Sequence, residues 1–112
     1  MRFLLLTEGL EAQPEATDEQ TRDYNRRWVE WAGALIQSGT LVAGGPLMPT
    51  ASLVTKDGAS DLPLQRQDVY GYLLVNAGSL EEAIEIARQA PHTELGGRTI
   101  VRPCIDMQPG LA

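Results

Sequence analysis

Apolar positions along the chain follow two kinds of spacing, which predict four main strands and two helices. Short apolar runs without helical spacing predict buried strands over residues 3–7, 40–43, 69–76 and 99–103. Apolar side chains that repeat every three or four residues predict helices over residues 18–38 and 80–90. The predicted order is therefore strand, helix, strand, a polar insertion, strand, helix, strand.

Both predicted helices begin at a capping box, in which two side chains satisfy free backbone N–H groups reciprocally. Thr17 pairs with Gln20 in the first box, and Ser79 pairs with Glu82 in the second. Pro91 should end the second helix, because the residue before a proline is pushed out of the helical region. The apolar stripe of the first helix comprises Tyr24, Trp28, Trp31, Ala32, Leu35 and Ile36. The inward positions of the second helix comprise Leu80, Ala83, Ile84 and Ala87.

Residues 48–67 are predicted to form a hairpin-like insertion. Residues 51–55 have strand character and are followed by the turn signal Asp57-Gly58. Just before the insertion, Gly44-Gly45-Pro46 weakens a strand. This triplet indicates either a β-bulge or a place where a ligand approaches the backbone.

The order of elements predicts the fold class. Two strand–helix–strand units with right-handed crossovers give a four-stranded antiparallel sheet with both helices on one face. This is the ferredoxin-like α+β arrangement, βαββαβ, here with an inserted hairpin, and residues 1–112 should form one domain. Because a small domain rarely leaves an apolar sheet face in water, we expect a homodimer in which two sheets pack as a dimeric α+β barrel.

Charge and cysteine content narrow the classes of partner. The net charge is −6 and the nine Lys and Arg residues form no run, so no nucleic-acid partner is expected. Cys104 is the single cysteine, which excludes a disulfide within the chain, and we expect no metal site and no cofactor. The apolar run at residues 3–6 is too short for a signal peptide or a membrane span. We therefore expect a cytoplasmic protein without a membrane partner.

His92 is the only histidine and is the candidate catalytic residue. An imidazole can act as a general acid or base near neutral pH. The alternative is structural, because a histidine just beyond a helix end can satisfy free carbonyl groups. Asp57, Asp61 or Asp68 could orient the ring if the insertion folds over it, and turn formation is the other interpretation of these three.

Five residues are candidates for ligand binding: Trp28, Gly45, Pro46, Tyr72 and Arg102. Trp28 either forms a flat apolar pocket wall or packs in the core, whereas Trp31 is expected mainly in the core. Gly45 and Pro46 could form a pocket floor where a ligand meets the backbone. Arg102 could hold an anionic ligand, or it could form an ion pair at the sheet end or dimer contact.

Three segments, taken in order, carry a family resemblance. The first is Trp28-x-x-Trp31 followed by Ser-Gly-Thr-Leu-Val-Ala-Gly-Gly-Pro-Leu at residues 38–47. The second is Tyr-Gly-Tyr-Leu-Leu-Val at residues 70–75. The third spans residues 79–103 and contains Pro-His, Gly-Gly and Val-Arg-Pro. Over almost its whole length the chain resembles the YCII-related family, particularly its branch named for an Asp-Gly-Pro-Phe motif.

The resemblance implies a dimeric α+β barrel with a pocket between sheet and helices, in a cytoplasmic bacterial setting. Most members are uncharacterised, and one relative is a dehydrochlorinase of a chlorinated hydroxyquinol with a His-Asp pair proposed as catalytic. The chain departs from the pattern at residues 61–64, Asp-Leu-Pro-Leu, where Gly and Phe are missing. Residues 18–38 also lack the histidine that the family places on its first helix, so the catalytic pair does not transfer.

The expected function is small-molecule binding by a homodimer. A cofactor-free lyase or isomerase activity would use His92 as acid or base. The alternative is a non-catalytic dimerisation, ligand-sensing or regulatory domain, because this fold serves many functions.

Overall fold

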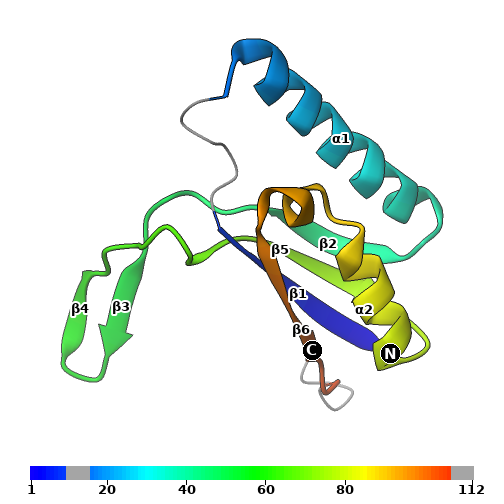
Figure 1. Cartoon of the computed structure of the whole chain (residues 1–112). Helices are drawn as coiled ribbons and strands as arrows, with labels where there is room; N and C mark the ends of the chain where they lie inside the picture. The colour runs from blue at the N-terminus through cyan, green and yellow to red at the C-terminus, as the bar shows by residue number, and fades with distance from the viewer. Residues whose placement is uncertain (10–15, 107–112) are drawn as a thin grey trace.

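The computed structural model describes residues 1–9 and 16–106. The strands of its main sheet are β1 (Arg2–Glu8), β2 (Leu41–Pro46), β5 (Val69–Asn76) and β6 (Arg98–Pro103). They lie in the order β2-β5-β1-β6, and every neighbouring pair is antiparallel. The helices are α1 (Asp18–Gln37), α2 (Leu80–Arg88) and the short 3-10 helix η1 (Pro91–Leu95). The predicted ferredoxin-like α+β fold is thereby confirmed (Figure 1).

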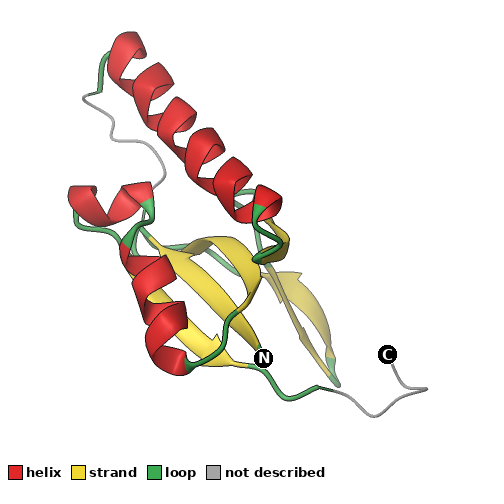
Figure 2. Ribbon diagram, turned by 90° about the vertical axis from the view of Figure 1, so that its right-hand side faces the viewer, coloured by secondary structure: helices red, strands yellow, loops and turns green. Residues whose placement is uncertain are grey.

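The core lies between the main sheet and the two helices, which cover the same face (Figure 2). Alternation along β1 and β5 directs every second side chain to this face. Its buried residues are Phe3, Leu5, Leu73, Val75, Ala77, Ala83 and Ala87. Trp31 and Leu35 of α1 pack against this cluster while remaining partly exposed, which confirms the core position expected for Trp31.

The helix ends follow the predicted capping chemistry, with one difference. Thr17 and Gln20 form the complete reciprocal box, with N–H donors 3.1 Å and 2.9 Å from the side-chain oxygens. Ser79 accepts a hydrogen bond from the backbone N–H of Glu82, but the Glu82 carboxylate accepts from Gly78 rather than from Ser79. In the second box the glutamate therefore caps the N–H group of the residue before the serine, instead of the N–H group of the serine itself.

The inward stripe predicted for α2 is partly wrong. Ala83 and Ala87 are buried as expected, but Leu80 and Ile84 are 42% and 41% exposed. Ile86 packs against the core instead. The stripe is rotated toward the small alanines because they allow the helix to approach the sheet closely.

The insertion forms an isolated hairpin, as predicted. Strands β3 (Ser52–Thr55) and β4 (Gly58–Asp61) pair only with each other, in a separate two-stranded sheet. All their residues are exposed, and the hairpin extends away from the main sheet (Figure 1). Gly58 has a φ of +137°, a conformation that glycine adopts readily.

The register irregularity in β2 lies between Leu41 and Ala43, before the Gly-Gly-Pro triplet where it was expected. Gly44 pairs regularly with Leu73 of β5, so the Gly-Gly-Pro triplet itself is not a bulge. A Cβ atom on Gly44 would lie 2.8 Å from the carbonyl oxygen of Tyr72, so the close approach of two strands explains this glycine. No helix within residues 1–9 and 16–106 is long and apolar enough to cross a membrane.

Candidate functional site

A cavity of about 420 Å³ lies between α1 and the helix-covered face of the sheet. Its α1 side is formed by apolar and aromatic side chains, including Trp28, Ala32 and Ile36. Its sheet side is formed where β1, β2 and β5 meet, at Thr7, Gly44 and neighbouring residues. A volume of this size is within the range of small-molecule sites.

The cavity exists because α1 stands away from the sheet. No residue of α1 is fully buried, although the helix has 20 residues. The radius of gyration is 15.7 Å, whereas a compact domain of this length has about 13 Å. Both the hairpin and the open packing of α1 contribute to this extended shape (Figures 1 and 2).

His92 lines the cavity and is only 5% exposed. Its Nε2 lies 3.0 Å from the carbonyl oxygen of Arg98 and 3.1 Å from the Thr99 hydroxyl oxygen. A carbonyl oxygen only accepts, so Nε2 carries the proton that it donates to Arg98. In the neutral ring Nδ1 then has a free lone pair, and this atom is buried without a hydrogen-bond partner among the described residues.

The His92 ring is held between an indole and a glycine. Trp28 stacks on it, with ring centroids 5.5 Å apart and planes inclined by 25°. On Gly97, a Cβ atom would lie 2.3 Å from Cδ2 of the ring, so no larger residue fits there without moving the histidine. Gly96, with a φ of +85°, caps η1 and turns the chain toward β6. His92 therefore has one fixed orientation.

The cavity lining is polar at few points. Thr7 is the last inward position of β1 and is nearly buried; a Cβ atom on Gly71 would lie 2.6 Å from its hydroxyl oxygen. Asn25 adds an amide from α1. None of the described residues that line the cavity is Asp, Glu, Lys or Arg. Within the described part of the chain, no group of three or more His, Cys, Asp or Glu side chains is placed to hold a metal ion.

The structure brings together five of the six residues proposed from the sequence. Trp28, Gly45, Pro46, Tyr72 and His92 all line the cavity. Tyr72 does so through its backbone, because its neighbour Leu73 faces the helices and strand alternation directs the phenol to the opposite face.

Arg102 lies elsewhere. It belongs to β6, where it pairs with Leu4 of β1, and it is exposed and not among the residues that line the cavity. Alternation along β6 gives it the face opposite to Val101, which packs against the core. An anionic ligand held by Arg102 in this cavity is therefore not supported, because the sheet separates the two.

The acidic partner considered for His92 is not used. Asp57 and Asp61 belong to the hairpin region, and Asp68 accepts a hydrogen bond from the Gln65 N–H in a turn. The hydrogen bonds of the imidazole go to Arg98 and Thr99 instead.

Three lining residues with polar groups were not proposed as site residues from the sequence: Thr7, Asn25, and Tyr24, which was assigned only to the apolar stripe of the first helix. Thr7 has a recognisable signal, because it is the only polar residue in the inward row that begins with Phe3 and Leu5. Asn25 has no such signal in the sequence, because it precedes Arg26 and Arg27 on a helix whose polar face already contains many polar and charged residues.

Solved structures with a similar fold include an enzyme. The structure is similar to the 5-chloro-2-hydroxyhydroquinone dehydrochlorinase of Burkholderia phenoliruptrix AC1100, solved in complex with 2,5-dihydroxybenzoquinone. The TM-score is 0.57 at 20% sequence identity, over 94% of this chain and 94% of that one. No protein-family model matches the chain, and no curated protein matches it significantly. The likeness supports a fold of the YCII-related kind.

Proposed function

We propose that this chain is a YCII-related protein that binds a small hydroxylated ring in the cavity between α1 and the sheet. His92 would act there as the general acid or base of a cofactor-free lyase or isomerase. The observation that carries the proposal is the buried, unpartnered Nδ1 of His92 among the cavity residues. A buried polar atom without a protein partner is suited to a hydrogen bond from a ligand.

The proton transfer follows from the tautomer. Nε2–H is engaged by the Arg98 carbonyl, so Nδ1 is the atom that would take a proton from a ring hydroxyl or carbon once a bound ligand displaces the side chains that cover it. In an isomerisation the imidazole returns this proton to another ring atom. In an elimination the electron pair of the broken O–H or C–H bond forms a new double bond in the ligand, the leaving group departs with the electron pair of its own bond, and the imidazole then gives up the proton to that group or to water. Stacking on Trp28 keeps the ring oriented throughout.

The lining favours a planar ligand that enters uncharged. Trp28 offers an aromatic face, and glycines replace side chains on the sheet side. Without a charged residue in the described lining, burial of a carboxylate would be unfavourable because its hydration would not be replaced. The related dehydrochlorinase was solved with a hydroxylated six-membered ring, which agrees with a ligand of this kind.

The dimeric α+β barrel belongs to the same proposal. Alternation places Leu4, Leu6, Tyr72 and Leu74 on the sheet face away from the helices. Ile100, opposite Leu6, extends this apolar row onto β6. An apolar face of this extent is typical of an interface between subunits.

The test combines binding, turnover and mass. We expect hydroquinone to bind at least about tenfold more tightly than 4-hydroxybenzoate, by isothermal titration calorimetry. With a panel of chlorinated and unchlorinated hydroxylated rings, we expect turnover by the wild type and a turnover rate about a hundredfold or more lower in His92→Gln.

The His92→Gln variant keeps an N–H donor for the Arg98 carbonyl. Thr93→Gln, on the exposed side of η1, is the matched control. Absence of both binding and turnover in the wild type would contradict the proposal, as would a light-scattering mass of 12.2 kDa rather than twice that value for the dimer.

A ligand-sensing domain is the second candidate. It is favoured by the partners of the His92 ring, because the described hydrogen bonds of the imidazole go to a main-chain carbonyl and a hydroxyl rather than to a carboxylate that could orient a catalytic base. Tight binding by the wild type and by His92→Gln, with no turnover by either, would select this function.

A further inference from the structure

Two consecutive residues of α1 contact two consecutive residues of η1. Trp28 stacks on His92, and the guanidinium of Arg27 donates a hydrogen bond to the carbonyl oxygen of Pro91 at 3.3 Å. A second nitrogen of the same guanidinium pairs with the Glu94 carboxylate at 2.9 Å. Arg27 thus holds η1 on both sides of His92, across 64 and 67 residues of sequence.

These contacts lie where the core no longer supports α1. Trp31 and Leu35, which pack against the core cluster, belong to the C-terminal half of the helix. Arg27 and Trp28 lie one turn closer to the N-terminus, beside the cavity. The position of this part of α1 over His92 therefore depends on the contacts with η1.

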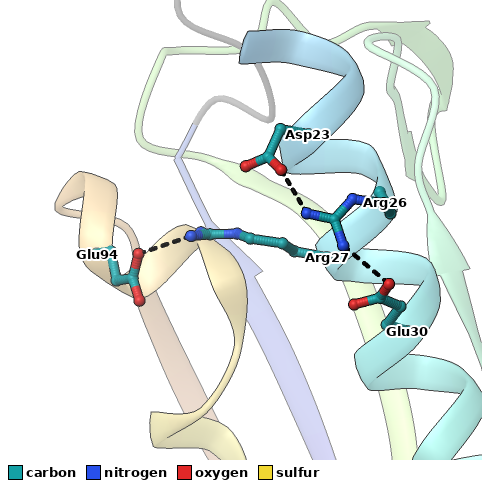
Figure 3. A network of polar contacts seen from close by, with 5 residues as sticks. All are labelled: Asp23, Arg26, Arg27, Glu30 and Glu94. Atoms are coloured by element: carbon teal, nitrogen blue, oxygen red, sulfur yellow. Dashed lines mark hydrogen bonds and ion pairs between the residues drawn. The ribbon is translucent and has the colours of Figure 1, made fainter. Parts of the chain in front are cut away.

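Arg26, the preceding residue, provides a natural contrast (Figure 3). It pairs with Asp23 and with Glu30 at 2.9 Å, both within α1, and its hydrogen bonds to these two carboxylates raise its pKa. The Arg26 side chain is 59% exposed, whereas that of Arg27 is 34% exposed and has its Nε buried. Both arginines make two polar interactions, but only those of Arg27 join two elements.

We propose that Arg27 is the positioning residue of the cavity. Its guanidinium fastens α1 to η1, which keeps Trp28 stacked on His92 and keeps the histidine covered. The planar guanidinium group has several N–H donors and can bond a carbonyl and a carboxylate at the same time. The ammonium group of a lysine concentrates its charge and its donors on one nitrogen. Loss of Arg27 should therefore allow the N-terminal half of α1 to swing away while the core remains folded.

The chain offers a direct measurement because it contains one histidine. Diethyl pyrocarbonate reacts with an accessible neutral imidazole, and the ultraviolet difference spectrum of carbethoxyhistidine reports His92 alone. We expect Arg27→Ala to accelerate this reaction by about three- to tenfold, the range of a partly buried, charge-assisted contact. Arg27→Lys should lie between Arg27→Ala and the wild type, and Arg26→Ala should react at the wild-type rate.

Amide hydrogen exchange separates local opening from unfolding. In Arg27→Ala the core amides of β1 and β5 should keep their wild-type protection while the His92 reaction is accelerated. The proposal is overturned if Arg27→Ala leaves the rate unchanged, if Arg26→Ala accelerates it equally, or if core exchange rises in the same proportion. No ligand is needed, so failure here would leave the proposed function untouched.

Discussion

The two helices cover the same sheet face in different ways. The shorter one, α2, has nine residues and places Ala83 and Ala87 in the buried core against β1 and β6. The longer one, α1, has 20 residues and none of them is fully buried. Small side chains let α2 approach the sheet, whereas the indoles of Trp28 and Trp31 hold α1 away from it. Tight packing stabilises one half of the fold, and the looser half contains the cavity.

The largest expected effect is overpacking of α2. Ala83 has no exposed surface, so Ala83→Leu should lower the free energy of unfolding by about 1–3 kcal/mol, because the added carbons have no space beneath the helix. Urea unfolding at one fixed protein concentration measures the change. Glu81→Leu, an exposed position on the same helix, should stay within about 0.5 kcal/mol of the wild type. Equal stability of Ala83→Leu and the wild type would show that α2 is packed no more tightly than α1.

The same substitution in α1 should affect binding rather than stability. Ala32 lines the cavity, so Ala32→Leu can fill empty space and should change the unfolding free energy by less than about 0.5 kcal/mol. Hydroquinone, the probe proposed above, should bind about tenfold more weakly, since the new side chain occupies its volume. Ala34→Leu, on the exposed side of the helix, is the calorimetric control. A loss of stability comparable with that of Ala83→Leu would contradict the contrast between the helices.

Removal of the helix caps should give the smallest effect. Ser79→Ala should lower the global stability by about 1 kcal/mol, because α2 is part of the core. Thr17→Ala removes a complete capping box, yet it should lower global stability by less than half as much, because the first turn of α1 lies outside the core. Its effect should appear as faster amide exchange in the first turn of α1. The contrast fails if both variants lose equal global stability and exchange in that turn is unchanged.

Local chemistry explains which features could be predicted. The Thr17 box and the Asp57-Gly58 turn depend on neighbouring residues alone, and each occurs as expected. The rotation of α2 was not predictable, because Leu80 and Ile84 match the helical period as well as Ala83 does. Only the distance between helix and sheet decides between them.

The identity of most site residues could be predicted from the sequence, but the contacts between them could not. His92 and Trp28 were identified separately from their chemistry, and the sequence gives no reason to stack them. Their contact depends on Arg27 reaching η1, an interaction between residues far apart in the chain. Arg102 shows the opposite case: its guanidinium was a reasonable candidate for binding an anion, but it lies on the face of the sheet away from the cavity.

The contact between His92 and Gly97 has a consequence for how such a site can change over generations. A Cβ at residue 97 would lie 2.3 Å from Cδ2 of the imidazole and 2.8 Å from the carbonyl oxygen of His92, so a histidine at residue 92 in this position requires a glycine at residue 97. A descendant that keeps the histidine should also keep the glycine. A descendant that loses the histidine is released from the clash with the ring only, because the carbonyl oxygen of residue 92 would still lie 2.8 Å from that Cβ. The glycine is therefore expected to outlast the histidine, and a larger residue at position 97 would indicate that the backbone of η1 itself has moved.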